Sequence, residues 1–426
     1  MAGENFLYYK LRNNTAELWQ SDGAVTIYNY NTSSQCLYDL RSYQNDLFFQ
    51  TVILADANGY SYLINLDNTD RYFLTGSNLH FEFNNGTALN IPTVSSVQAI
   101  RDFQYVSNVD YNWKIDEKIL NRNKKYIGAE YTIDIVNGYF PTFASARQYI
   151  NEGDILIFSE GEYEEDFIMN ITGVDFYLKN ENVIFNFTDN TVRFSGINRI
   201  FGKGKIIQEG TSTTAAVYFT QTTEANLFSF ISLSYLYSGG NRSMTTDTGK
   251  CFVKIKTMET ADNSHGNIDT DSLSVYADLD VFEMIHLGSR ENIFPITNAG
   301  TNEYFIRGCK FTCSGASGNI NVNYVTPLIL NLVNCFMVNT GSGVSAREHA
   351  NISSTGSDLI LTLNLWNCFF ATDSNAHTFY HNNQSVAGIL NLYSNIYAPM
   401  TYIADSPITE TKDGEIIIEN NITSVL

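Results

Sequence analysis

Apolar and polar residues alternate with a period of two in a seven-residue pattern that recurs through the second half of the chain. In Leu330-Asn331-Leu332, two leucines flank an asparagine, and the same order returns at Leu363 and Leu390. This alternation is typical of a β-strand whose leucines point inward while the asparagine points outward. Including weaker copies, the pattern begins at Phe228, Val253, Leu279, Tyr304, Leu330, Leu363, Leu390 and Ile416.

The spacing between these starting positions is nearly constant, at 25, 26, 25, 26, 33, 27 and 26 residues. A fixed period in this range predicts a solenoid, in which each coil buries its apolar face against its neighbours. Leucine-rich repeats have a similar composition, but their coil is usually shorter and starts with a Leu-x-x-Leu sequence that is missing here. The pattern therefore favours a parallel β-helix, and we count about ten coils.

Each copy of the pattern also carries a residue suited to a bend in the backbone. Glycine, asparagine and serine tolerate the left-handed conformation that a tight bend requires. The expected bend positions are Gly308, Asn334, Asn367, Ser394 and Asn420.

The segment before the repeats has a strand, helix, turn and strand order. Residues Thr132–Asp134 and Ile155–Phe158 are predicted strands, Thr142–Ile150 is a predicted short helix, and Gly161–Tyr163 is a predicted turn. This order resembles the entry to the pectin-lyase-like right-handed β-helix. The resemblance implies an all-β fold with a right-handed parallel β-helix over residues 126–426, and it implies little about activity.

Residues 1–125 lack the repeat and are expected to form a small β-rich N-terminal domain. The basic segment Asn121–Lys125 is the predicted boundary between the two domains. Turn signals separate the short predicted strands, as in antiparallel hairpins. These strands are Val25–Tyr28, Phe48–Leu54, Tyr60–Ile64 and Leu79–Phe83. The first 30 or so residues fit equally well as an extended anchoring arm.

Composition excludes several classes of function. A formal net charge of −20 argues against a nucleic-acid partner, because phosphate binding requires a surplus of Lys and Arg. No apolar run is long enough to predict membrane insertion, and the N-terminus lacks the features of a signal peptide. The six cysteines are expected to be buried thiols. The histidines are scattered, and neither a metal site nor a cofactor is expected.

The sequence offers two groups of candidate binding residues. Arg347, Glu348 and His349 lie in the segment that lengthens one repeat to 33 residues, and loops leaving a rigid scaffold often bind ligands. Asp280 and Asn331 are expected to point outward in one column with Phe305. A pair of carboxylates on adjacent coils would suit glycoside hydrolysis, but the chain has no polygalacturonase or pectate-lyase motif. No catalytic residue is assigned, and the sequence favours binding over catalysis.

An acidic chain with a β-rich N-terminal domain and a β-helical shaft resembles bacteriophage tailspikes and head or tail fibres. The resemblance implies a structural appendage on the virion surface, made in the host cytoplasm. Its N-terminal domain would attach to other virion proteins, and its solenoid, a homotrimer, would contact host surface polysaccharide. The abundant aromatic residues support a trimer, because they exceed what one narrow solenoid core can hold. The alternatives are a tailspike depolymerase (a glycoside hydrolase or lyase) and a cellular adhesin, which the missing signal peptide disfavours.

Overall fold

The structure is a computed structural model of the whole chain. The structure describes residues 5–114, 128–210, 214–220, 229–246, 249–261, 266–270, 275–288, 291–294, 302–313, 318–322, 328–339, 352–355, 361–372, 379–382, 388–398, 402–404 and 408–417.

The N-terminal region contains two small antiparallel sheets, as the short strands and turn signals predicted. One sheet has the strand order β3-β2-β1-β5-β4, and the other has the order β6-β7-β8. Their strands are β1 (Phe6–Arg12), β2 (Thr15–Gln20), β3 (Val25–Asn29), β4 (Thr51–Ala55), β5 (Ser61–Asn65), β6 (Thr69–Thr75), β7 (Asn78–Phe83) and β8 (Ala88–Pro92). The β4–β5 turn is fixed by Asp56, whose carboxylate accepts hydrogen bonds from the backbone N–H groups of Asn58 and Tyr60.

Two helices of this region, α1 (Ser33–Asp46) and α2 (Ser96–Lys114), were not predicted from the sequence. Each starts at a hydroxyl cap: Thr32 accepts from the backbone N–H of Gln35, and Ser95 accepts from that of Gln98. The buried side of α2 includes Asp102, which interrupts the apolar pattern that would otherwise reveal an amphipathic helix. Both helices are also poor in alanine and leucine, which favour helices most, so their composition did not predict a helix either.

The rest of the chain forms the predicted parallel β-helix, which has three sheets along its sides. In the first and second sheets, all pairings between successive coils of the described residues are parallel. The first sheet contains β9 (Glu130–Ile133), β10 (Ile155–Phe158), β13 (Asp175–Leu178), β16 (Arg199–Gly202), β25 (Asn302–Arg307), β28 (Leu328–Val333), β31 (Leu361–Trp366), β34 (Gly388–Tyr393) and β37 (Ile408–Asp413). The second contains β11 (Gly161–Tyr163), β14 (Val183–Phe187), β17 (Lys205–Gln208), β26 (Lys310–Cys313), β29 (Phe336–Asn339), β32 (Phe369–Thr372), β35 (Ile396–Ala398) and β38 (Ile416–Ile417).

Three long strands cross from the first sheet to the second. They are β19 (Ser229–Ser238), β21 (Gly249–Thr260) and β23 (Val275–His286). The third sheet has ten strands in sequence order. These are β12 (Phe167–Met169), β15 (Val192–Ser195), β18 (Val217–Thr220), β20 (Met244–Thr246), β22 (Ile268–Thr270), β24 (Ile293–Phe294), β27 (Ile320–Val322), β30 (Ile352–Thr355), β33 (Phe379–Asn382) and β36 (Tyr402–Ala404).

The clear copies of the repeat have the predicted register. Leu330, Leu363 and Leu390 stack on one another inside the solenoid and are nearly inaccessible to solvent. Four predicted bends have a positive φ, including 53° at Asn334 and 48° at Asn367. All six cysteines are free and buried, as expected. Ahead of the first full coil, the short helix α3 (Phe143–Arg147) starts at the capping residue Thr142.

For the weaker copies the predicted register is only partly right. Val253 stacks on Leu279 and Tyr304 stacks on Leu330, as predicted, but other pairings differ. Leu279 stacks on Ile306, two residues beyond the predicted Tyr304, and Val253 stacks on Ile231. The predicted start at Phe228 lies outside the described residues. At the other end, Ile416 stacks on Ile396, because the last coil is shorter than the period. Its bend is therefore at Gly414, with a φ of 73°, and the predicted Asn420 lies outside the described residues.

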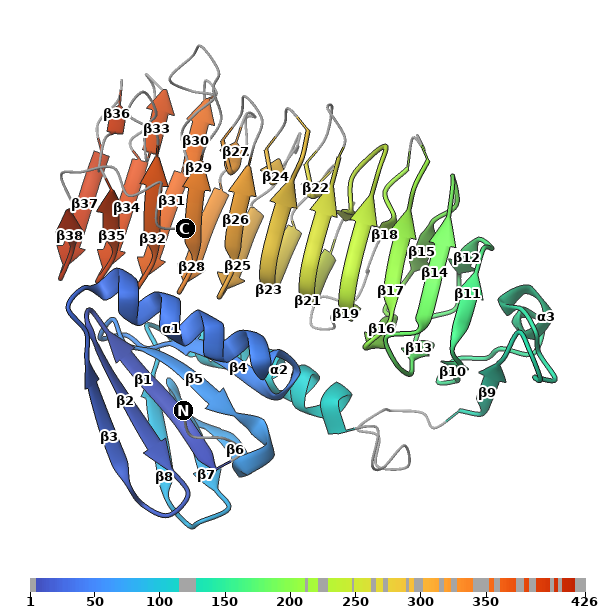
Figure 1. Cartoon of the computed structure of the whole chain (residues 1–426), viewed down its shortest axis with the longest axis horizontal. Helices are drawn as coiled ribbons and strands as arrows, with labels where there is room; N and C mark the ends of the chain where they lie inside the picture. Colours follow the sequence, from blue (N-terminus) through green and yellow to red (C-terminus); the bar gives the residue numbers. More distant parts are fainter. Residues whose placement is uncertain are drawn as a thin grey trace.

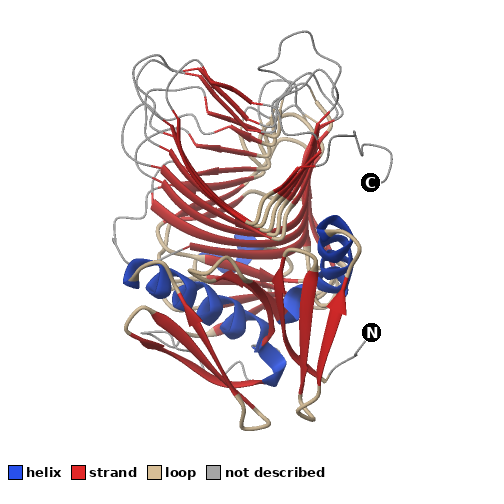
Figure 2. Cartoon of the chain, turned by 90° about the vertical axis from the view of Figure 1, so that its left-hand side faces the viewer, coloured by secondary structure: helices blue, strands red, loops and turns tan. Residues whose placement is uncertain are grey.

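The N-terminal region packs along the side of the β-helix (Figure 1). Helices α1 and α2 and strand β4 all contact the strands of the solenoid, through Arg41, Asp102 and the Ile53 carbonyl respectively. In the end-on view of Figure 2, the helices and strands of this region lie along one side of the solenoid. We call the outer side of the first sheet, where this packing occurs, the covered face. We call the outer side of the second sheet from β14 to β26, where half-buried polar residues predominate, the open face.

Candidate functional site

One outward column of the covered face is rich in aromatic side chains. It consists of Phe230, Phe252, Asp278 and Phe305 on successive coils, and all four are almost completely buried. Tyr105 of α2 contacts the ring of Phe252, with 6.0 Å between the ring centroids. These outward residues of the solenoid thus share an apolar core with the N-terminal region, separate from the core inside the solenoid.

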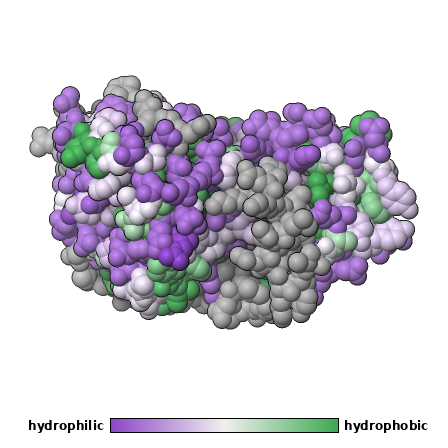
Figure 3. Space-filling model, turned by 90° about the horizontal axis from the view of Figure 1, so that it is seen from below, coloured by the Kyte–Doolittle hydropathy of each residue, from purple (hydrophilic) through white to green (hydrophobic). Residues whose placement is uncertain are grey.

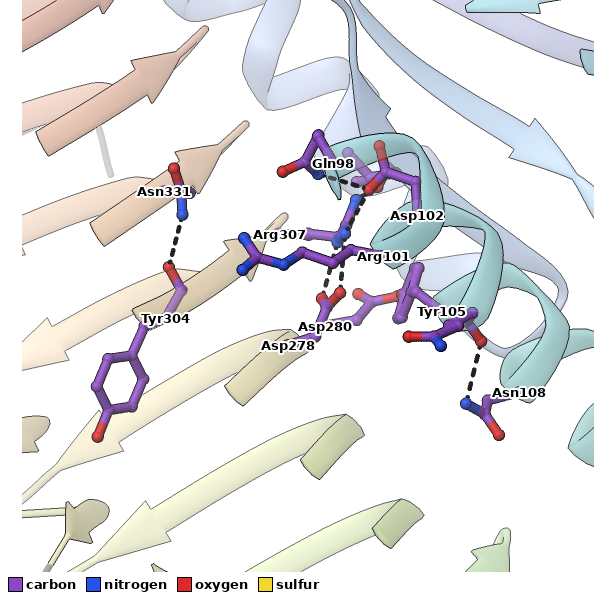
Figure 4. A network of polar contacts seen from close by, with 12 residues as sticks. Gln98, Arg101, Asp102, Tyr105, Asn108, Asp278, Asp280, Tyr304, Arg307 and Asn331 are labelled. Carbon is purple, nitrogen blue, oxygen red and sulfur yellow. Dashed lines mark hydrogen bonds and ion pairs between the residues drawn. The ribbon is translucent and has the colours of Figure 1, made fainter. Parts of the chain in front are cut away.

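Arg307 is the centre of a charged cluster within this apolar interface (Figure 4). Its guanidinium donates two hydrogen bonds to the carboxylate of Asp278, both at 2.9 Å. A third nitrogen donates to the Ile53 carbonyl, and Nη2 also donates to Asp102 of α2, each at 2.9 Å. Arg307 and both aspartates are at most 1% exposed. Paired donors and acceptors of this kind offset the cost of removing the charges from water.

A second ion pair lies beside the first. Lys254 of β21 donates hydrogen bonds to Asp280 at 2.8 Å and to the Thr51 carbonyl at 2.7 Å. The Tyr105 hydroxyl also donates to Asp280. We call these six residues the interdomain cluster: Asp102, Tyr105, Lys254, Asp278, Asp280 and Arg307.

The interdomain cluster contains three carboxylates and two cations. Burial raises the pKa of Asp278 to about 6, partly opposed by Arg307 and reinforced by the neighbouring Asp102 and Asp280. Burial also raises the pKa of Asp102. Because the cluster has one more carboxylate than cations, protonation of one carboxylate reduces the repulsion between the negative charges.

Helix α1 makes a smaller polar contact with the solenoid. Arg41 donates to the carbonyls of Gly308 and Phe282 at 2.9 and 3.0 Å. Gly308 has a φ of 60°, and a Cβ there would lie 2.6 Å from the Gln44 side chain. Asparagine occupies the equivalent bends at Asn334 and Asn367, so the close approach of α1 is what favours glycine over asparagine at this bend.

The structure places Asp280 and Asn331 at the same interface, but in different columns. Asp280 stacks on Arg307, whereas Asn331 stacks on Phe305, which in turn stacks on Asp278. The predicted single column was wrong because the weak copy at Leu279 was aligned two residues out of register. The three other candidates, Arg347, Glu348 and His349, lie outside the described residues.

Asn331 begins a ladder of asparagine side chains. Asn364 donates to Asn331 at 2.8 Å, and Asn391 donates to Asn364 at 2.7 Å. Asn331 itself donates to Glu303 at 3.1 Å, and Glu303 pairs with Arg101 of α2. Asn331 is only 5% exposed, so its amide serves the stacking of coils and the contact with α2.

The open face has an arrangement that the sequence reading missed. Tyr235 and Tyr237 point outward from β19 with their rings nearly parallel, at 5°, and their centroids 6.3 Å apart. The Tyr235 hydroxyl donates to Glu259 of the next coil at 2.9 Å. Burial and the Glu259 charge raise the pKa of both tyrosines, so their hydroxyls stay protonated. We call Tyr235, Tyr237 and Glu259 the tyrosine platform.

The alternation Tyr235-Leu236-Tyr237 is the signal that could have revealed this platform. A strand with Leu236 inward must present both tyrosines outward. The platform was missed because each copy of the repeat was compared only over its first residues. The two tyrosines lie further along β19, where this strand joins the second sheet.

Other kinds of site find no support in the described part of the chain. No group of three or more His, Cys, Asp or Glu side chains there is arranged to hold a metal ion. Among the described residues, no helix is both long and apolar enough to cross a bilayer. The side of the N-terminal region that faces away from the solenoid is mainly hydrophilic, with scattered apolar patches (Figure 3).

Comparisons with known proteins add no family to this description. No family model matches the chain, and no curated protein and no solved structure is significantly similar to it.

Proposed function

We propose that the protein is a structural and adhesive appendage of the virion-spike type, which binds surface polysaccharide through the tyrosine platform. The observation that carries the proposal is the pair of parallel tyrosine rings beside Glu259 on the open face. Aromatic rings offer flat apolar surfaces to sugar rings, and carboxylate oxygens accept hydrogen bonds from sugar hydroxyls.

The packing of the N-terminal region supports a mechanical role. The charged and aromatic contacts of the covered face fix that region against the shaft, as suits an appendage that must stay rigid. The edge strand β3 exposes Val25 and Ile27, at 42% and 59%. An exposed apolar edge strand suits attachment to another virion protein.

Catalysis is a weaker candidate at the carboxylates of the covered face. Asp278 and Asp280 project from one strand, but both are fully buried beneath α2 and bonded to Arg307 and Lys254 respectively. A polysaccharide would have to displace the N-terminal region before reaching them. This burial favours adhesion over depolymerisation.

Binding to a panel of immobilised bacterial capsular and lipopolysaccharide glycans tests the proposal. We expect the wild-type protein to bind at least one glycan, and the double variant Tyr235→Ala/Tyr237→Ala to bind it at least about tenfold more weakly. The control is Tyr139→Ala, which removes a tyrosine that is 86% exposed at the entry to the solenoid. Binding by no glycan, or equal weakening in both variants, would contradict the proposal. Release of new reducing ends above a heat-inactivated control would instead establish a depolymerase.

We also propose that three copies assemble into a homotrimer, as in the resembled spikes. The covered face is occupied by the chain's own N-terminal region, so the contacts would use other faces of the solenoid. Sedimentation at low micromolar concentration is expected to give a trimer. A single species of 47.9 kDa would contradict it.

A further inference from the structure

Three lysines border the Tyr235 side of the tyrosine platform. Lys205 of β17 lies directly beside Tyr235 in the strand register, and Thr257 of β21 lies on the other side of Tyr235. Lys256 precedes Thr257 at the corner where β21 passes from the first sheet to the second. Lys203 occupies the same corner two coils earlier, between β16 and β17. We call Lys203, Lys205 and Lys256, all of them half-buried, the lysine rim.

The lysine rim is not neutralised by the chain itself. Within the described residues, none of its three ammonium groups has a carboxylate within ion-pair distance. Lys203 contacts only a ring, with its ammonium 5.2 Å from the centroid of Trp113. Further along the same open face, by contrast, Lys310 pairs with Glu283 at 3.3 Å. The cations beside Tyr235 therefore remain able to pair with an anion from outside the chain.

The Tyr237 side of the platform carries the opposite charge. Glu259 lies directly beside Tyr237 in the register of β19 and β21. Burial and the charges of Glu259 and Glu209 raise the pKa of Tyr237, so both carboxylates lie close to its ring. The platform thus has cations at one ring and carboxylates at the other, and this polarity orients a ligand that carries a negative group.

The net charge of −20 does not cancel this local arrangement. At physiological ionic strength, interactions between exposed charges are largely screened beyond about 8 Å. Adjacent coils of a β-helix lie about 4.8 Å apart, and Lys205 and Lys256 are on the coils to either side of Tyr235. A negative group bound at Tyr235 therefore interacts mainly with the lysine rim.

We propose that the tyrosine platform selects an anionic glycan, whose sugar rings lie on Tyr235 and Tyr237 and whose negative groups pair with the lysine rim. A carboxylate and a phosphodiester both provide the oxygen acceptors that an ammonium group binds. The three cations belong to separate positions along the solenoid, which suits negative groups repeated along a chain. The inference rests on the proposed function, because it adds the charge of the ligand to the same site.

Binding of the full-length protein to neutral, uronic-acid-containing and phosphodiester-containing capsular polysaccharides tests the proposal. We expect the acidic polysaccharides alone to bind. Reducing their carboxylates to alcohols with carbodiimide and borohydride should weaken binding at least about tenfold where the recognised group is a carboxylate, and leave it unchanged where that group is a phosphodiester. Neutral glycans binding as tightly as acidic ones would overturn this inference but not the adhesive function. Binding to no glycan would overturn both.

Charge-neutralising variants locate the binding. Lys205→Gln/Lys256→Gln is expected to weaken binding of the acidic glycan at least about fivefold, because two attractions are lost. The matched control is Arg147→Gln/Arg193→Gln, which removes the same charge at exposed positions of α3 and β15, away from the open face. The control should bind like the wild type. Equal weakening in the two variants would show a general effect of charge and overturn the assignment to the lysine rim.

Discussion

The covered and open faces of the solenoid are built on the same strands and differ in what their outward side chains contact. On the covered face, β21 presents Phe252 and Lys254, both completely or almost completely buried. Past the bend of the same strand, Thr257 and Glu259 point outward and are only half-buried. The inward residues of the repeat thus form the core of the coil. The outward residues determine on which side of the solenoid the N-terminal region packs.

This comparison shows where many of the aromatic side chains are buried. The abundance of aromatic residues suggested a trimer, because the solenoid core alone could not bury them. Many of them lie between the solenoid and the chain's own N-terminal region, including Phe230, Phe252 and Phe305. The aromatic content is therefore no longer an argument for a homotrimer, whose contacts would have to involve other faces of the solenoid.

The largest expected effect is that of Arg307→Ala on the covered face. The variant leaves Asp278 and Asp102 buried without their cation, which should cost about 3 to 5 kcal/mol of unfolding free energy. The control is Arg71→Ala, which removes the exposed ion pair with Glu82 and should cost far less, because solvent screens that pair. Chemical denaturation measures both. Similar losses in the two variants would show that the cluster is not a major source of stability.

The next effect concerns pH. Because the pKa of Asp278 is raised to about 6, the folded protein keeps this proton at pH values where the unfolded chain has released it. Its contribution to stability is therefore largest below about pH 4 and is lost as the pH rises through about 6. The change is on the order of 2 to 3 kcal/mol.

The Asp278→Asn variant isolates this effect, since asparagine cannot titrate. The unfolding free energy of the wild type minus that of the variant should fall as the pH rises from about 4 to 7. A difference that stays constant or rises over this range would contradict the raised pKa. Denaturant titrations at several pH values provide the measurement.

A smaller effect should separate two hydroxyl groups that both donate to a carboxylate. Tyr105→Phe removes the buried bond to Asp280 and should cost about 1 to 3 kcal/mol. Tyr235→Phe removes the half-buried bond to Glu259 on the open face and should cost less than about 1 kcal/mol. The comparison fails if the Tyr235 variant is the less stable of the two.

The smallest expected effect on stability is that of Tyr237→Ala on the open face. This ring is half-buried and its neighbours are on the outer surface of the solenoid, so the unfolding free energy should change by less than about 1 kcal/mol. A loss of several kcal/mol, measured by thermal or chemical unfolding, would show that the platform is part of the fold rather than a free binding surface.

The sequence predicted the solenoid because its inward pattern is regular. Leu330, Leu363 and Leu390 occupy equivalent positions, and the bends at Asn334 and Asn367 follow from the same register. The interdomain cluster could not be predicted in this way. Its contacts join residues far apart in the sequence, and Asp102 has no local pattern that would point to Arg307. The helix α2 was missed partly for the same reason, since its buried Asp102 breaks the apolar pattern and is satisfied only by a distant residue.

The order in which the chain is synthesised gives the interdomain cluster a further consequence. Asp102 leaves the ribosome 205 residues before its partner Arg307. At about 5 to 20 residues per second, α2 waits on the order of 10 to 40 s for the strand against which it packs. During this interval Tyr105 and the Asp102 carboxylate lack their partners on the solenoid, which makes the nascent N-terminal region a candidate for chaperone binding. The final docking is then a late folding step that connects distant parts of the chain, and such steps are slow.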